Sequence, residues 1–454
     1  MRDGRLYAKP EPTACKGLRK RLRDLAAELQ QVLNDLLTEP FGAGRAQLLD
    51  RAEFLELRID ETRAQMEAAG CDAPLPHDPV PTVAPSLEEF GHGRIRVSGR
   101  KALGPRPLVV MLMEWDDDGQ GGFLKISDEH PLEYYEELAF GHPTSPFTTT
   151  PVNPASLTEY VQECSSGRFW FTRAGVLGPV SMGVFGSPSE AEHVQKVAKR
   201  IAEVFPYQLY GMDADASSVV TADELVVLAV ENHRVRWPAN RVTEAIPFTV
   251  NLIPFSITKT MQLNLAFAGA FTPFYQIGHE VSHSLGTLDM YDPNNSNHLL
   301  TLMGAYPFDS NDQVVVHLDA WHKLALGWCE PERIQLTGHG GANVFEISPQ
   351  RPDGAVILWH PSRMASEYFL LEHRTPAGGR KYDVDFPGDG VLIWHIDPSR
   401  APMHRGAPHL VPGTNDVWLT GMETPPLTWT DGSVAVGSLT FAAGPEPNST
   451  LVSW

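Results

Sequence analysis

The sequence predicts an α+β fold in several parts, and three observations predict it. Apolar residues recur every three or four positions near the N-terminus, as in a pair of packed helices. Runs typical of buried strands then alternate with a helical pattern, and short apolar runs separated by Gly and Pro follow. We therefore expect a helical hairpin at residues 1–71, a proline-rich linker at 72–98, a central part at 99–335 and a β-rich part at 336–454.

The hairpin is expected because each of two helices carries a seam of apolar residues. Side chains at spacings of three and four share one face of a helix, so two such helices pack along their seams. In the second helix, which follows a PFGAG turn, apolar residues repeat at spacings of three and four from Leu48 to Met66. The hairpin could cap the rest of the chain, act as a prosegment or mediate self-association. In the first helix the seam is formed by Leu18, Leu22, Leu25, Leu29, Val32 and Leu36.

The linker is expected from its composition. Residues 72–98 contain five prolines and no apolar periodicity. Such a composition is typical of an extended segment without regular secondary structure. A domain boundary is therefore expected within this stretch.

The residues after the linker contain the elements of a sheet covered by helices. LVVMLMEW (108–115) and LVVLAVEN (225–232) are largely apolar, as strands buried on both faces are. Between them, SPSEAEHVQKVAKRIAEVF (187–205) begins with Ser and Glu and carries apolar residues at helical spacing. From residue 336 onward, the runs VFEISP, AVILWH, EYFLLEHR and GVLIWHID predict strands separated by turns.

The charge of the chain disfavours one class of partner. Its formal net charge is −20. Residues 1–70 are electrically balanced, so the excess of acid lies in the rest of the chain. An acidic surface argues against a nucleic-acid partner and suits the binding of divalent cations.

Neither the cysteines nor the N-terminal residues indicate export. Cys15, Cys71, Cys164 and Cys329 are far apart and form no CxxC pair, so the sequence indicates no cysteine-ligated metal and no disulfide framework. The N-terminal residues lack the apolar core of a secretory signal, and no run of 18 apolar residues occurs. On sequence alone we expect a cytoplasmic protein without a transmembrane segment.

Residues 279–283 read HEVSH, and this pattern is the main functional candidate. Positions four apart share a face of a helix, so His279 and His283 can present two imidazoles to one metal ion. Zinc favours such nitrogen ligands, and a catalytic zinc site has three protein ligands and a water. Glu280 would take a proton from that zinc-bound water as it attacks a carbonyl group. A pair of partly buried histidines bonded to their neighbours is the alternative.

Two further residues extend the pattern to HExxHxxGxxD. Gly286 permits the conformation in which a helix ends and the chain turns back, so that Asp289 can supply a third, oxygen ligand. Met303 lies in a Gly-containing turn, TLMGAYP, that resembles the Met-turn beneath the zinc of metzincins. We therefore expect zinc at the two histidines and Asp289, within a zincin/metzincin-like catalytic domain at 99–335.

A second metal signal lies at residues 213–224, DADASSVVTADE. These residues follow the ligand order of a calcium loop, although a strand rather than a helix is expected after them. At position 6, where the sharp turn normally needs glycine, the chain has Ser218. An acidic solvated loop is the alternative. The candidate calcium ligands are Asp213, Asp215, Ser217, Val219 through its carbonyl, Thr221 and Glu224.

Residues downstream of the zinc pattern are further candidates. Tyr306 or Tyr291 could donate a hydrogen bond to the oxyanion of the tetrahedral intermediate, or pack as an ordinary aromatic side chain. His317 could replace the carboxylate ligand if that carboxylate faced calcium instead. His298 and His322 are expected at the surface or beside the site.

These motifs resemble the M6 family of metallopeptidases, the immune inhibitor A type. Residues 156–180 are similar to the family's helix, Ser-Gly-Arg/Lys turn and strand pair, and GHEVSHSLGTLDMYD (278–292) is similar to its zinc helix. LMGAYP followed by residues 317–331 resembles its Met-containing turn and Leu-Gly-Trp helix. Residues 367–374 and 386–397 resemble two strands of its β-rich part, whereas the helical hairpin lies outside the resemblance.

The resemblance implies a zinc endopeptidase acting on protein or peptide substrates. It implies His279, His283 and Asp289 as zinc ligands, Glu280 as general base and acid, and structural calcium. Family members are mostly secreted with cleaved N-terminal segments, and this chain departs from that pattern because no signal peptide is visible. The alternative is a catalytically weak or inactive homologue that acts as a metal-stabilised binding module. A zinc hydrolase of a non-protein amide would share the same site residues.

Overall fold

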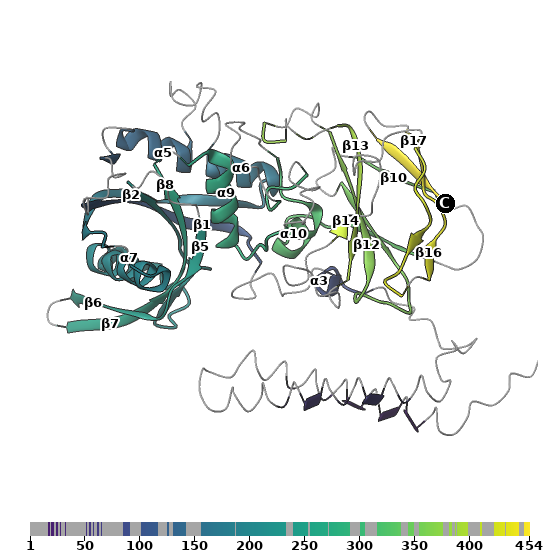
Figure 1. The fold of residues 1–454 in the computed structure, drawn as a ribbon, viewed down its shortest axis with the longest axis horizontal. Coiled ribbons are helices and arrows are strands. Elements are labelled where there is room, and N and C mark those ends of the chain that lie inside the picture. The colour runs from purple at the N-terminus through teal and green to yellow at the C-terminus, as the bar shows by residue number, and fades with distance from the viewer. Residues whose placement is uncertain are drawn as a thin grey trace, which may run out of the picture. The chain divides into compact units, whose positions relative to one another are not determined.

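The protein forms two compact units in a computed structural model, Met1–Thr82 and Val83–Trp454 (Figure 1). Each unit is an independent body with its own internal contacts. The structure describes separate positions between 17 and 65, and residues 85–90, 101–116, 125–126, 130–141, 156–186, 188–232, 239–252, 255–270, 272–290, 300–304, 316–336, 344–348, 354–375, 381–383, 386, 388–397, 409–410, 422–431, 433–444 and 449–454.

The described part of the first unit is helical. Val32 and Leu55, both members of the predicted seams, are buried. The Arg51 guanidinium forms an ion pair with Glu28, which joins the two helical stretches within this unit. The PFGAG turn expected between them lies outside the described residues. The described helical positions lie between 17 and 32 and between 51 and 65.

A five-stranded sheet forms the centre of the second unit. Its strands are β1 (Gly104–Asp116), β2 (Phe169–Val184), β4 (Val226–Glu231), β5 (Ala239–Val242) and β8 (Asn264–Gly269). Four strands are parallel in the order β2-β1-β4-β8, and β5 pairs antiparallel with β8 at the edge. The strands predicted at 108–115 and 225–232 are confirmed as β1 and β4. With helices and strands both present, the α+β class is confirmed.

Helices and a smaller sheet cover the two faces of this sheet (Figure 1). Successive side chains of a strand point to opposite faces, so Leu108 and Val110 pack in one core and Val109 and Met111 in another. The first core includes residues of α5 (Leu132–Phe140), α6 (Leu157–Cys164) and α9 (Phe274–His283). The second includes residues of α7 (Glu190–Val204), α8 (Pro206–Met212) and the sheet β3-β7-β6, formed by Val219–Thr221, Phe255–Gln262 and Ile246–Leu252.

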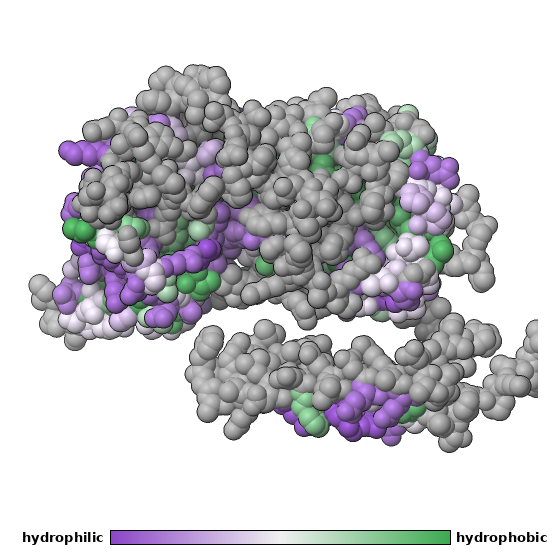
Figure 2. Space-filling view, viewed as in Figure 1, coloured by the Kyte–Doolittle hydropathy of each residue, from purple (hydrophilic) through white to green (hydrophobic). Residues whose placement is uncertain are grey.

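Helix α7 confirms the helix predicted at 187–205. Its Ser189 cap accepts a hydrogen bond from the backbone N–H of Glu192, whose carboxylate accepts one from the Ser189 N–H. Its outer face carries exposed charged side chains, and Figure 2 shows a largely hydrophilic surface on this side of the unit. Among the residues that the structure describes, no helix is long and apolar enough to cross a membrane.

The C-terminal part is built of strands, as its short apolar runs predict. A five-stranded sheet has the order β14-β13-β12-β11-β9, formed by His409–Leu410, Gly390–Ile396, Tyr368–Arg374, Ala355–Trp359 and Glu332–Gln335. One face of this sheet packs on a second sheet, β10-β18-β17, formed by Val344–Ile347, Thr450–Ser453 and Thr440–Ala443. Strands β15 (Leu427–Thr428) and β16 (Val434–Val436) form a further pair.

The central and C-terminal parts share one core. The boundary expected between them lies inside the second unit, and Trp359 of β11 belongs to the same core cluster as residues of α6, α9 and α10 (Ala320–Leu326). Buried charges also cross between the two parts. Lys323 of α10 pairs with Glu372 of β12 at 3.1 Å, and Arg374 of β12 donates a hydrogen bond to the Leu300 carbonyl of the central part. The central part is therefore packed directly against the C-terminal sheet.

Part of the expected linker is folded. Residues Leu87–Phe90 form the short helix α3, begun by Ser86 and Glu89, which exchange cap hydrogen bonds. Phe90 is 1% exposed, and its ring centroid lies 4.9 Å from that of Tyr368. The five prolines predict an extended segment, but one turn of helix ending in a buried aromatic side chain overrides that composition. Residues 85–90 thus belong to the second unit.

The strand pair expected after residue 167 is one continuous strand. β2 pairs in parallel with β1 over its whole length, with three register shifts. Gly175, Gly178 and Gly183 all have positive φ angles and lie at or next to these shifts. Glycines therefore form irregularities within a single strand at the place where the resemblance implies two strands.

Phe90→Ala tests whether the α3 segment is part of the folded second unit. Truncating a buried Phe leaves a cavity, so we expect a loss of about 3 to 5 kcal/mol in the free energy of unfolding. Urea unfolding followed by tryptophan fluorescence measures it. Phe54→Ala, at a half-exposed Phe of the first unit, is the control and should change little. A loss below about 1 kcal/mol for Phe90→Ala would contradict the assignment.

Candidate metal centre

Helix α9 places two histidines on one face. It follows Pro273, and Phe274, Ile277 and Val281 bury its apolar side in the core beneath the central sheet. His279 and His283 are one helical turn apart, and their ring centroids lie 4.8 Å from each other. The packing of the apolar side therefore determines where both imidazoles point.

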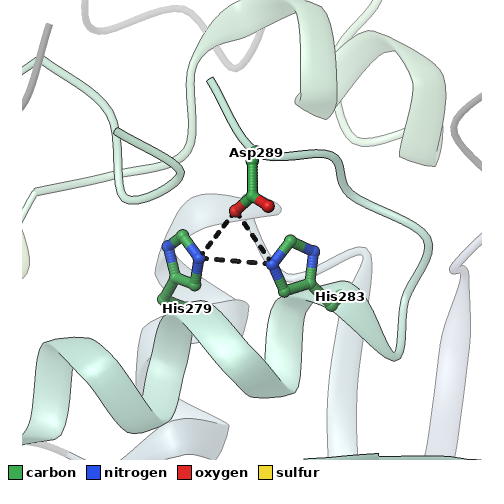
Figure 3. Close-up of side chains that lie close together, drawn as sticks. All are labelled: His279, His283 and Asp289. Carbon is green, nitrogen blue, oxygen red and sulfur yellow. Dashed lines mark hydrogen bonds and ion pairs between the residues drawn. The ribbon is translucent and has the colours of Figure 1, made fainter. Parts of the chain in front are cut away.

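The chain turns back over the helix immediately after α9. Gly286 has a φ of +98°, a conformation that side-chain-bearing residues rarely adopt. Its N–H donates to the carbonyl of His283 at 2.9 Å, which closes the turn. The turn returns Asp289 to the face of α9 that carries the histidines (Figure 3). The structure thus places both predicted residues as the spacing HxxGxxD requires.

Three potential ligand atoms surround one point, which we call the meeting point (Figure 3). His279 Nε2 lies 3.0 Å from Asp289 Oδ1, His283 Nε2 lies 3.2 Å from the same oxygen, and the two Nε2 atoms are 3.2 Å apart. The ligands of a tetrahedral zinc ion, each at 2.0–2.1 Å from the metal, lie about 3.3 Å from one another. The triangle therefore fits zinc to within a few tenths of an ångström.

The opposite nitrogen of each ring determines its tautomer. His279 Nδ1 bonds to the carbonyl oxygen of Leu302 at 2.9 Å, and His283 Nδ1 bonds to that of Thr287 at 2.8 Å. A carbonyl oxygen only accepts hydrogen bonds, so both Nδ1 atoms carry the proton. In the neutral rings each Nε2 then has a lone pair directed at the meeting point. This is the arrangement of metal-ligating histidines in proteins.

The meeting point requires positive charge. Two lone pairs and a carboxylate oxygen face one another there, so a proton or a metal ion must lie between them. Burial opposes charging of these groups, but the hydrogen bond to Asp289 outweighs it and raises the pKa of His283. The same burial would raise the pKa of Asp289, but its bonds to His279 and His283 lower it well below the ordinary range.

Glu280 is nearly buried beside the two histidines. It is 8% exposed, and burial raises the pKa of its carboxyl group even though the neighbouring histidines oppose the shift. A carboxylate whose pKa is raised toward neutrality is suited to accept a proton and release it again. Its position in the chain and its environment both fit the predicted base.

Met303 lies in a turn closed by a hydrogen bond from Gly304 N–H to the Thr301 carbonyl. Met303 is fully buried, and the Thr287 hydroxyl donates to its sulfur at 3.4 Å. The preceding residue, Leu302, supplies the carbonyl that holds His279. The turn therefore orients a ligand as well as filling space.

In the candidate calcium loop, several of the oxygen atoms expected to bind calcium already bond to protein groups. Ligand atoms of Asp213, Asp215 and Glu224 lie within 4.8 Å of one another, and Ser218 adopts a φ of +68°, the left-handed conformation that the glycine position requires. However, both Glu224 oxygens accept backbone N–H groups at 2.8 to 3.2 Å, and the Lys259 ammonium is paired with Asp213. The donor set as it stands does not fit calcium.

The remaining sequence candidates divide into two groups. Tyr291, His298 and Tyr306 lie outside the described residues. His317 is described, but its Nε2 bonds to Glu163 at 2.9 Å, away from the three converging atoms, so it does not replace Asp289 as a ligand.

Sequence reasoning missed a buried polar chain behind the metal centre. His322 Nδ1 bonds to Asp319 at 2.6 Å, and His322 Nε2 accepts the N–H of Leu288 at 3.1 Å. Asp319 also accepts the Thr301 hydroxyl at 2.7 Å. Burial would raise the pKa of Asp319, but His322 and the other donors lower it to about 2. The Asp-x-x-His spacing at the start of a helix is the sequence signal that could have revealed it.

Comparison with known proteins adds no relative. No family model matches the chain, and no curated protein matches it. The fold and the site therefore stand on their own geometry.

His279→Ala or His283→Ala should abolish stoichiometric zinc binding. Each substitution removes one of three converging ligands and leaves the carboxylate without a cation. Metal analysis of zinc-loaded, dialysed protein measures the molar ratio of zinc to protein. We expect this ratio to be near one for wild type and near zero for the variants. His360→Ala is the control, because His360 bonds to Ser362 and is not one of the converging residues. Unchanged zinc content in both ligand variants would disprove the site.

Proposed function

We propose that the chain is a zinc-dependent endopeptidase that hydrolyses peptide bonds of protein substrates, with a zincin/metzincin-like catalytic domain at residues 99–335. One observation gives the main support for this proposal. His279 Nε2, His283 Nε2 and Asp289 Oδ1 converge within 3.2 Å, while both Nδ1 atoms are committed to backbone carbonyls. The resemblance of the motifs to the M6 family supports the proposal from the sequence.

The number of ligands favours a catalytic site over a structural one. Structural zinc sites have four protein ligands, whereas catalytic sites have three and keep one position open. Among the described residues, the group at α9 consists of His279, His283 and Asp289. Two imidazoles and one carboxylate oxygen form a donor set that zinc accepts readily.

Zinc, when bound there, would polarise a substrate carbonyl and lower the pKa of water. Glu280 would accept the proton that water loses as its oxygen bonds to the carbonyl carbon. The C–N bond then breaks, and Glu280 returns that proton to the departing amine. A carboxyl group whose pKa is raised by burial can perform both transfers in one cycle.

The edge of the central sheet supplies a place for an extended peptide. β5 pairs with β8 on one side, and among the described strands none pairs with its other side. The Asn240 side chain donates to the Glu280 carbonyl and the Ser284 hydroxyl, each at 2.9 Å, which fixes this edge to α9. An open edge offers backbone donors and acceptors to any extended chain, whatever its side chains. A polypeptide substrate therefore suits this position.

Glu280→Ala and Glu280→Gln test the chemistry. Loss of a general base should lower kcat/KM toward denatured casein or a peptide library by about 10²- to 10⁴-fold. Zinc content should remain near one per chain, because Glu280 is not among the converging ligands. Initial rates and metal analysis on the same preparations measure the two quantities.

The surface variant Glu203→Gln is the control and should keep wild-type activity. Full cleavage by both Glu280 variants would refute this role of the residue. A zinc-loaded wild type that cleaves nothing in the library would refute the peptidase assignment and favour a metal-stabilised binding module.

A further inference from the structure

The residue next to the third ligand is held by a buried histidine. His322 and Asp319 are both 0% exposed. His322 Nε2 accepts the backbone N–H of Leu288, which directly precedes Asp289. The backbone leading to the ligand carboxylate thus has a fixed partner on α10.

The same pair also holds the turn that supports His279. The Thr301 hydroxyl donates to Asp319 Oδ2 and accepts the Met303 N–H at 3.3 Å. Between these two residues, Leu302 offers its carbonyl to His279 Nδ1. The Asp319 carboxylate, at the N-cap of α10, therefore connects to two of the three candidate ligands through separate chains of hydrogen bonds and adjoining backbone.

We infer that Asp319 and His322 are positioning residues of the metal centre, which hold Asp289 and His279 at ligand distance. This inference rests on the proposed zinc site. His322 can accept from Leu288 only when its proton is on Nδ1, and Asp319 keeps it there. In the other tautomer, His322 Nε2–H would face the backbone N–H of Leu288. Repulsion between these two donors would displace the segment that carries Asp289.

Asp319→Asn changes the tautomer with little change in shape. Asn still caps a helix, so α10 keeps its N-terminal hydrogen bond, but its amide N–H₂ faces His322 Nδ1. We expect zinc affinity to fall about 10- to 100-fold, as for other partners of metal ligands. Competition with a chromogenic chelator measures the dissociation constant. His322→Ala should behave similarly, and His322→Gln should recover part of the affinity because its amide oxygen can accept from Leu288.

His395→Gln is the matched control. His395 is also buried and also paired with a carboxylate, Glu367 at 2.9 Å, but it lies in the C-terminal sheet. Loss of folding stability alone would be similar in the control and in the α10 variants, whereas only the latter should lose zinc affinity. Wild-type affinity in folded Asp319→Asn and His322→Ala would overturn the inference. A wild type that binds zinc without cleaving peptides would refute only the proposed function.

A second, independent observation concerns the acidic loop at 213–224. Lys259 lies on β7, which pairs with β3 so that Thr260 is opposite Val219 of the loop. Its Nζ reaches Asp213 Oδ2 and stands 4.4 Å from the Tyr210 ring centroid. The side chain of Asp213 is fully buried, so its charge needs a cation at this position.

We propose that the Lys259 ammonium replaces calcium in this loop and makes its fold independent of the ion. Three features support it: the Lys259–Asp213 pair, the backbone donors on Glu224, and the bond from the Ser217 hydroxyl to the Val219 carbonyl, which joins two of the expected ligands. Asp213 Oδ1 is buried without a hydrogen bond in the described part of the chain. Removing the ammonium should therefore leave a carboxylate that recruits a cation.

Lys259→Gln tests this proposal by its effect on thermal stability. In zinc-loaded protein and calcium-free buffer, its melting temperature should fall by a few degrees, because about 1 kcal/mol corresponds to roughly 2 to 4 °C in a large domain. Calcium at millimolar concentration should restore part of that loss in the variant and leave wild type unchanged.

Lys196→Gln is the matched control, because Lys196 also stands 4.4 Å from an aromatic ring, that of Trp115, without facing the loop. It should not respond to calcium. A calcium-dependent rise in wild type that Asp215→Asn removes would overturn the proposal. Absence of any calcium response in a destabilised Lys259→Gln would overturn it as well.

Discussion

The geometry of the metal centre depends on two hydrogen bonds from imidazole nitrogens to backbone carbonyls. His279 bonds to Leu302 and His283 to Thr287, and these bonds decide which nitrogen of each ring is free. Neither carbonyl belongs to the helix that carries the histidines. The turn at Gly286 positions one carbonyl and the turn at Met303 positions the other. The helix supplies the two histidines, and the two turns determine how their rings face the candidate metal site.

Sequence predicted the parts of the site that are close together in the chain. The two histidines, Gly286 and Asp289 lie within 11 consecutive residues, and periodicity with glycine chemistry suffices to place them. The burial of the predicted strands followed equally from their apolar runs. These features depend on local spacing, which a single sequence displays directly.

Sequence could not predict the partners that tertiary packing supplies. His322 is 34 residues from Leu288, and Lys259 is 46 residues from Asp213, so neither pairing has a local pattern. Spacing alone therefore indicates a calcium loop, whereas the neighbouring strand adds a positive charge to it. The segment at 85–90 differs for a similar reason, since its proline-rich surroundings carry no sign of the aromatic contacts that bury Phe90.

The guanidinium of Arg374 has a consequence for the order in which the protein is completed. It lies on β12, is fully buried, pairs with Asp383 and donates to the Leu300 carbonyl at the start of the segment that carries Met303. Arg374 is 74 residues further along the chain than Leu300, so that segment acquires this anchor only after the intervening residues have been synthesised. During synthesis the histidine helix therefore exists before its support does. The candidate metal site therefore gains this support only when β12 has been synthesised and the C-terminal sheet docks.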